Sequence, residues 1–160
     1  MLAFIDRISA LCGRVAAGLF FVIGLLIAYE VTARYVFTAP TPWTEEISRF
    51  LQIWATYLAA AFVLANRDMI AIDFFTSRMK PGPRRLCETA SLLVVSAFCF
   101  VAMVYGMEIV AESVAQNRHT STMLGVPRWM TETAVPLGCA LLLAQAVAEL
   151  ARLWSRRGPR

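Results

Sequence analysis

The sequence predicts an all-α integral membrane protein with four transmembrane helices and both termini on the cytoplasmic side. Of its 160 residues, 59% are apolar and 16% are charged, and the mean hydropathy is +0.62, a composition that few soluble domains have. Several long runs carry no charge and approach the ~20 residues that cross the hydrocarbon of a bilayer. Eleven of the fifteen Lys and Arg residues fall in the N-terminal region, the middle connection and the C-terminal tail, which this topology places in the cytoplasm. We therefore expect a single membrane domain over residues 1–160.

The first helix is predicted over residues 8–33, because residues 15–29 form an uncharged run rich in Leu, Ile, Val and Phe. Arg14 and Glu30 bound this run, and their long side chains can reach the two membrane interfaces. Arg7 and Arg14 ahead of an apolar run resemble a signal peptide, but no small-residue cleavage site is followed by a polar sequence. We interpret the segment as an uncleaved first helix.

The second helix is predicted over residues 44–66, of which residues 50–66 are uncharged. Thr44 is a suitable N-cap residue, since its hydroxyl can accept a hydrogen bond from a free backbone N–H of the first turn. Glu45 and Glu46 then stand in the first turn, where the positive end of the helix dipole favours carboxylates.

The third and fourth helices are predicted over residues 86–110 and 131–150. Ahead of the third helix, Pro81-Gly82-Pro83 is interpreted as a helix breaker. Residues 69–79 are about half apolar, which indicates a short helix lying along the membrane surface. Four basic residues of this connection are expected to contact lipid headgroups: Arg78, Lys80, Arg84 and Arg85.

The start of the second predicted helix carries the sharpest cluster of charge. Glu45 and Glu46 precede Arg49 by four and three residues, so either carboxylate can reach the guanidinium on one helix face. Charge is costly in hydrocarbon, so this cluster should lie at an interface or face protein. Two compatible interpretations stay open: an ion pair that ends the helix, and polar contact with a partner subunit.

Glu30 and Arg34 are also four residues apart, which favours an ion pair at the membrane interface. The alternative is that Glu30 is the coupling acid of a stand-alone four-helix proton-coupled exporter that acts as a homodimer. The boundary position of Glu30 argues against this alternative, because coupling carboxylates usually lie near the bilayer midplane.

No residue pattern points to catalysis or to a bound cofactor or metal. His119 is the only histidine, so it cannot supply a two-histidine haem site, which makes a redox-enzyme anchor a poor interpretation. No nucleotide-binding loop or nucleophile–base pair occurs. The basic pI of 9.2 follows from the topological bias without any nucleic-acid partner. The cysteines lie singly, without CxxC spacing, and are predicted to be buried inert thiols: Cys12, Cys87, Cys99 and Cys139.

Several short motifs follow one another in a distinctive order. They are Arg34-Tyr35-Val36-Phe37, Pro42-Trp43-Thr44-Glu45-Glu46 with Arg49 and Trp54, Ile70-Ala71-Ile72-Asp73, Gly125-Val126-Pro127-Arg128-Trp129 and Val135-Pro136-Leu137-Gly138. This order resembles the small membrane subunit (DctQ-like) of tripartite ATP-independent periplasmic (TRAP) transporters over nearly the whole chain. Asp68-Met69 stands where that family often has Gly-His, and Ser121-Thr122 where it often has Ser-Pro, so roles of those side chains are not carried over.

The resemblance implies a non-catalytic, multi-pass subunit of a secondary transporter in the bacterial inner membrane. It implies a large membrane subunit as partner, which moves its substrate by an elevator motion while the small subunit scaffolds its static part. A periplasmic binding protein would deliver an organic acid, such as a dicarboxylate, a keto acid or a sialic acid. A sodium gradient would drive uptake, with sodium bound by the large subunit. On this basis the candidate contacts with the large subunit are Arg34, Trp43, Glu45, Glu46, Arg49, Trp54 and Asp73.

Overall fold

The computed structural model describes residues 2–66, 81–120 and 125–155, and their fold is built from helices. The helices are α1 (Leu2–Tyr35), α2 (Pro42–Asn66), α4 (Pro81–Ala115), α5 (Arg128–Glu132) and α6 (Ala134–Ser155). Helices α5 and α6 form one span, because the backbone N–H of Thr133 between them still donates to the carbonyl of Trp129 at 2.9 Å. Four spans are thus long and apolar enough to cross a membrane, which confirms the predicted four-helix membrane fold.

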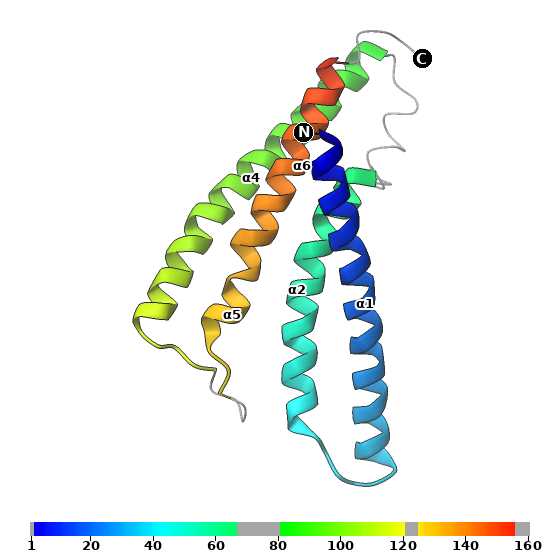
Figure 1. Ribbon diagram of the computed structural model, residues 1–160, viewed down its shortest axis with the longest axis vertical. Coiled ribbons are helices and arrows are strands. Elements are labelled where there is room, and N and C mark those ends of the chain that lie inside the picture. Colours follow the sequence, from blue (N-terminus) through cyan, green and yellow to red (C-terminus); the bar gives the residue numbers. More distant parts are fainter. Residues whose placement is uncertain (1, 67–80, 121–124, 156–160) are drawn as a thin grey trace.

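The four spans form two antiparallel hairpins that lie side by side (Figure 1). One hairpin is α1 with α2, and the other is α4 with α5 and α6. Helices α2 and α6 run in the same direction and contact each other, whereas α1 and α4 make no contact within the described residues. The order across the molecule is therefore α1, α2, α6, α4. The N-terminal end of α1 and the C-terminal end of α6 lie at the same end of the molecule (Figure 1).

Helix α1 buries a narrow face, along which buried residues recur every seven positions. Ser9, Ala16 and Ile23 are each less than a tenth exposed, and the Glu30 side chain continues the row at 12% exposed. A seven-residue repeat is the spacing of left-handed coiled coils, in which two helices keep one seam in contact over many turns. The packing of α1 along α2 thus leaves the other faces of α1 open.

Small residues let the spans approach closely at two places between helices α1, α2 and α6. A Cβ added to Gly13 of α1 would lie 2.3 Å from Cγ of Phe62 in α2. A Cβ added to Gly138 of α6 would lie 2.4 Å from Cβ of Tyr57 in α2. Helices in membranes pack largely through such close contacts, since lipid gives no hydrophobic drive between them.

The helices extend beyond the boundaries expected from the uncharged runs. Helix α1 begins at Leu2 instead of near residue 8, and α6 continues to Ser155. Helix α4 begins at Pro81, so Pro81-Gly82-Pro83 starts the helix instead of breaking it, because first-turn residues have no intrahelical N–H bond to lose. Charged residues also stay helical here, as the Arg84–Glu88 pair one turn apart illustrates. The expected surface helix over residues 69–79 lies outside the described residues.

Candidate partner-docking site

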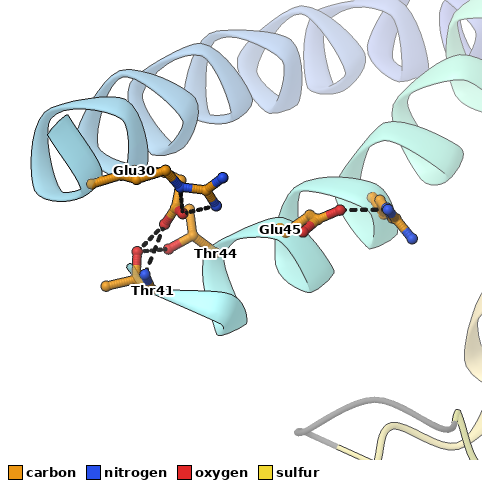
Figure 2. Close-up of polar contacts among 6 residues, drawn as sticks. Glu30, Thr41, Thr44 and Glu45 are labelled. Carbon is orange, nitrogen blue, oxygen red and sulfur yellow. Dashed lines mark hydrogen bonds and ion pairs between the residues drawn. The ribbon is translucent and has the colours of Figure 1, made fainter. Parts of the chain in front are cut away.

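The turn between α1 and α2 is organised by Glu30, Thr41 and Thr44 (Figure 2). The Glu30 carboxylate accepts hydrogen bonds from the Thr41 backbone N–H, at 3.2 Å, and from the Thr41 hydroxyl. The buried Thr44 hydroxyl donates to Thr41 Oγ1 at 3.1 Å. Our assignment of Thr44 as the N-cap is therefore wrong: α2 begins at Pro42, and Thr41 stands directly before it. Thr41 can stand at the start of α2 because the Glu30 carboxylate, on the preceding helix, accepts hydrogen bonds from both its backbone N–H and its hydroxyl.

Glu30 also forms the ion pair with Arg34 that the four-residue spacing predicted. Both the Nε and an Nη atom of Arg34 donate to Glu30 Oε1, the former at 3.2 Å. The carboxylate thus accepts four hydrogen bonds from two residues. It lies beside the N-terminal end of α2, where the helix dipole favours negative charge. This arrangement ties the end of α1 to the start of α2.

Trp43 lies on the surface next to this turn. Its ring packs against that of Tyr29, with 6.2 Å between the ring centroids, and Trp43 remains 40% exposed. Indole and phenol rings prefer the zone where hydrocarbon meets headgroups, because each has an apolar body and a polar group. The pair is thus of the kind that suits a membrane interface, and Trp43 supplies an exposed aromatic surface.

The charged cluster divides into an exposed pair and an inward-facing acid. Arg49 pairs with Glu45, and their side chains are 71% and 57% exposed (Figure 2). Glu46 is half-buried, and its Oε2 atom has no hydrogen-bond partner in the described part of the chain. Between the two carboxylates that the spacing allowed, the structure selects Glu45 as the partner of Arg49.

Trp54 is turned toward the protein instead of outward. It is half-buried, its ring packs against that of Phe50 at 6.4 Å, and its buried Nε1 has no partner among the described residues. Of the expected contact residues on α2, the outward ones are therefore Trp43, Glu45 and Arg49. Asp73 lies outside the described residues.

Residues 23–156 match the family described as Tripartite ATP-independent periplasmic transporters, DctQ component. The chain belongs to this family. It is therefore a TRAP transporter small permease subunit, a multi-pass protein of the bacterial inner membrane and a transporter component, not an enzyme.

Relatives with known names are similar to parts of this DctQ component. It is 25% identical over 135 residues to the isethionate TRAP transporter permease protein DctMQ of Oleidesulfovibrio alaskensis, a match that covers 79% of this chain and 21% of the relative. It is 28% identical over 86 residues to the sialic acid TRAP transporter permease protein SiaT of Haemophilus influenzae, a match that covers 54% of this chain and 14% of that relative. A putative TRAP transporter small permease protein of H. influenzae is 23% identical over 77 residues, 48% of each chain. The chain thus spans at most about half the length of these relatives.

The opposite end of this DctQ component contains a partly buried polar network that sequence reasoning missed. The Ser9 hydroxyl of α1 donates to Gln145 Oε1 of α6 at 3.0 Å, and Gln145 Nε2 donates to Asp6 at 3.3 Å. Arg152 bridges Asp6 and Glu149, the latter at 2.6 Å. Gln145, Glu149 and Arg152 are spaced by four and three residues, a pattern that could have indicated one polar face at the end of α6. The network joins the two hairpins at this end.

The basic residues expected at lipid headgroups lie partly within the described chain. Arg84 and Arg85 are exposed near the start of α4, and Arg84 Nε pairs with Glu88 at 2.8 Å. The start of α4 lies at the same end of the molecule as the N-terminal end of α1 (Figure 1). Arg78 and Lys80 lie outside the described residues.

The prediction of four buried thiols is wrong for two of them. Cys99 and Cys139 are buried between α4 and α6, but Cys12 is half-buried and Cys87 is exposed near the start of α4. Cys87 is exposed because it lies in the first two turns of α4, where residues 82–87 are all exposed.

His119 is an exposed residue of the connection between α4 and α5. Its Nδ1 is 2.9 Å from the carbonyl oxygen of Gly125. Its backbone pairs with that of Pro127 in an isolated antiparallel β-bridge. Within residues 2–66, 81–120 and 125–155, no three His, Cys, Asp or Glu side chains are grouped so as to hold a metal ion. The contact of His119 is thus a local one that shapes the connection.

Proposed function

We propose that this DctQ component is the non-catalytic scaffold for a large elevator-type permease subunit that takes up organic acids. A periplasmic binding protein delivers the substrate, and a sodium gradient acts through the large subunit. The named permease relatives support this proposal. The segment like this chain is about a fifth or less of their length, and their names refer to isethionate and sialic acid, both organic anions.

The observation that carries the proposal is the open layer of helices. Because α1 and α4 make no contact among the described residues, the spans do not close into a bundle around a central path. In the most apolar 18-residue stretch of each span, only 17% of the residues of α1 and 11% of those of α4 are buried inside the protein, against 44% for the α5–α6 span. A layer with two long open faces has the geometry of a support for another membrane protein.

The exposed residues at the start of α2 are proposed as part of the contact with the large subunit. Trp43 offers a ring of the type enriched at protein interfaces, and Arg49 offers a planar guanidinium with donors beyond the one used by Glu45. Arg34 lies at the same end of the molecule, with its side chain half exposed. Asp73 remains a candidate from its sequence motif alone.

The orientation is proposed to be N-in and C-in. The end of the molecule that carries the N-terminal end of α1 also carries Arg7, Arg84, Arg85 and Arg152. Trp43 and the Glu30–Thr41 turn lie at the other end, which the proposal places at the periplasmic interface. Arg78, Lys80, Arg84 and Arg85 then contact anionic headgroups of the cytoplasmic leaflet.

The exporter alternative is disfavoured by the contacts of Glu30. A coupling acid must bind and release a proton in each cycle, whereas this carboxylate accepts four hydrogen bonds that hold a turn at a helix end. A fixed contact of this kind is compatible with a scaffold, whereas it opposes the repeated protonation of a coupling acid.

Reconstitution tests the proposal directly. The chain is co-expressed with the large subunit of its own transporter, and vesicles with both subunits or with the large subunit alone are supplied with the binding protein and an organic acid. We expect sodium-dependent uptake only with both subunits. Proton-coupled transport by this chain alone, or full uptake without it, would refute the scaffold role.

A further inference from the structure

Helix α2 presents a row of polar side chains away from both of its neighbours. Glu45, Arg49, Gln52 and Thr56, here called the polar row, are spaced by four, three and four residues and therefore share one helix face. All four are exposed. The buried residues Thr44, Ser48 and Ala55 belong to a different face, which packs within the protein.

The polar row reaches into the depth of the bilayer. Helix α2 has 25 residues and is therefore ~37 Å long, about 7 Å more than the ~30 Å of hydrocarbon. Gln52 follows Pro42 by ten residues, or ~15 Å along the axis. Even if the whole excess length lay at the Pro42 end, Gln52 would lie ~8 Å inside the hydrocarbon. Thr56 lies one turn deeper.

Within the described residues, every side chain of the row except one has at least one hydrogen-bond partner. Arg49 pairs with Glu45, and the Thr56 hydroxyl donates to the backbone carbonyl of Gln52 at 2.8 Å. The Gln52 side-chain amide has no hydrogen-bond partner among the described residues. An exposed amide at this depth would face lipid tails, which offer neither donors nor acceptors, so it requires a polar group from another molecule.

We infer that the polar row is the docking surface for a transmembrane helix of the large permease subunit, with a hydrogen-bonding side chain or free backbone carbonyl opposite Gln52. This inference rests on the proposed function and deepens it. Gln and Thr side chains join helices in membranes through such hydrogen bonds. The ion pair Glu45–Arg49 then marks the outer limit of the same contact.

A second copy of this chain fits the polar row poorly. A two-fold axis along the membrane normal would place each residue opposite its own copy at the same depth. Glu45 would then meet Glu45, and Arg49 would meet Arg49, so like charges would be brought together. A partner of different sequence avoids this repulsion, which favours the large subunit over a homodimer.

Photo-crosslinking of the full complex in membranes tests the inference. The amino acid p-benzoylphenylalanine is placed at Gln52 in one variant and at Phe98, a 70% exposed residue of α4, in a matched control. We expect a stronger adduct with the large subunit from Gln52 than from Phe98. The inference is overturned by an adduct with a second copy of this chain, by no protein adduct at Gln52, or by equal adducts at both sites.

A second measurement separates this inference from the proposed function. Gln52→Leu should lower recovery of the large subunit about threefold, the value of one interhelical hydrogen bond in a membrane, whereas Phe98→Leu should not. Unchanged recovery with Gln52→Leu refutes the polar row while the scaffold role stands. Failure of the unaltered chain to bind the large subunit refutes both.

Discussion

Glu30 and Thr41 join the end of α1 to the start of α2 through two hydrogen bonds to one carboxylate oxygen. In a capping box, an acid in the first turn of a helix bonds the backbone N–H of its own N-cap residue. In α2 the first-turn position that such an acid would occupy, three residues after Thr41, is taken by Thr44. The acid that bonds the Thr41 backbone N–H comes instead from the preceding helix. The cap of α2 thus depends on the position of α1, which makes the hairpin turn part of both helices.

The first prediction is that Glu30→Gln leaves substrate uptake by the full complex largely intact. The amide keeps one oxygen for the Thr41 N–H but loses the charge that binds Arg34, so the thermal stability of the subunit should fall while transport continues. Uptake in reconstituted vesicles and thermal unfolding in detergent measure the two effects. Glu108→Gln, at an exposed acid of α4, is the control. Abolished uptake with normal assembly would favour a coupling role for Glu30.

The second prediction concerns Arg49 and Trp43. Arg49→Ala should weaken co-purification of the large subunit at least about tenfold, because it breaks a charge pair that docking removes from water. Arg49→Lys should restore binding only in part, since an ammonium lacks the fork of guanidinium donors. Arg118→Ala, which breaks an exposed pair with Glu112 at the same end of the molecule, is the matched control. Wild-type recovery with both Arg49→Ala and Trp43→Ala would leave this turn as a helix end only.

The third prediction uses two glycines in different environments. Gly138→Ala should lower the unfolding free energy by about 1–3 kcal/mol, because its new methyl would overlap Tyr57 and push α6 away from α2. A Cβ added at Gly18 would have no atom of a neighbouring element within 4 Å. Gly18→Ala should therefore be neutral or stabilising by up to about 1 kcal/mol. Reversible unfolding in mixed detergent micelles measures both. Equal effects would show that the approach of α2 and α6 is not tight.

The fourth prediction concerns the polar network between α1 and α6. Gln145→Leu keeps the side-chain volume but removes the acceptor of Ser9 and a donor to Asp6, in a fully buried place. We expect a loss of about 1–2 kcal/mol of unfolding free energy. Val147→Ala, at an exposed residue of the same helix, should have a smaller effect. A smaller loss for Gln145→Leu than for Val147→Ala would mean that the hydrogen bonds do not hold the two hairpins together.

The fifth prediction is the orientation in the membrane. Because basic residues concentrate on one side, reporters fused after Arg118 should lie in the periplasm and reporters fused after Lys80 in the cytoplasm. Fusions to alkaline phosphatase, which is active only in the periplasm, distinguish the two locations. Phosphatase activity at Lys80 with none at Arg118 would invert the proposed topology.

Much of the candidate site followed from spacing alone. The pairs Glu30–Arg34 and Glu45–Arg49 could be predicted because a helix sets the distance between residues four apart, whatever surrounds it. The choice of Glu45 over Glu46 could not, since it depends on which side of α2 faces the protein. The start of α4 was misplaced for a related reason: Pro81 breaks a helix interior but suits a first turn, and sequence alone did not distinguish the two positions.

The sequence by itself determined that the chain is a four-span membrane protein of the DctQ type, because uncharged runs and ordered motifs are properties of local sequence. Only the tertiary structure decided the order α1, α2, α6, α4, the contact of Ser9 with Gln145 and the outward position of Gln52. Four helices of similar apolar composition can pack in many orders. Close approaches such as Gly138 on Tyr57, which depend on shape, select one order.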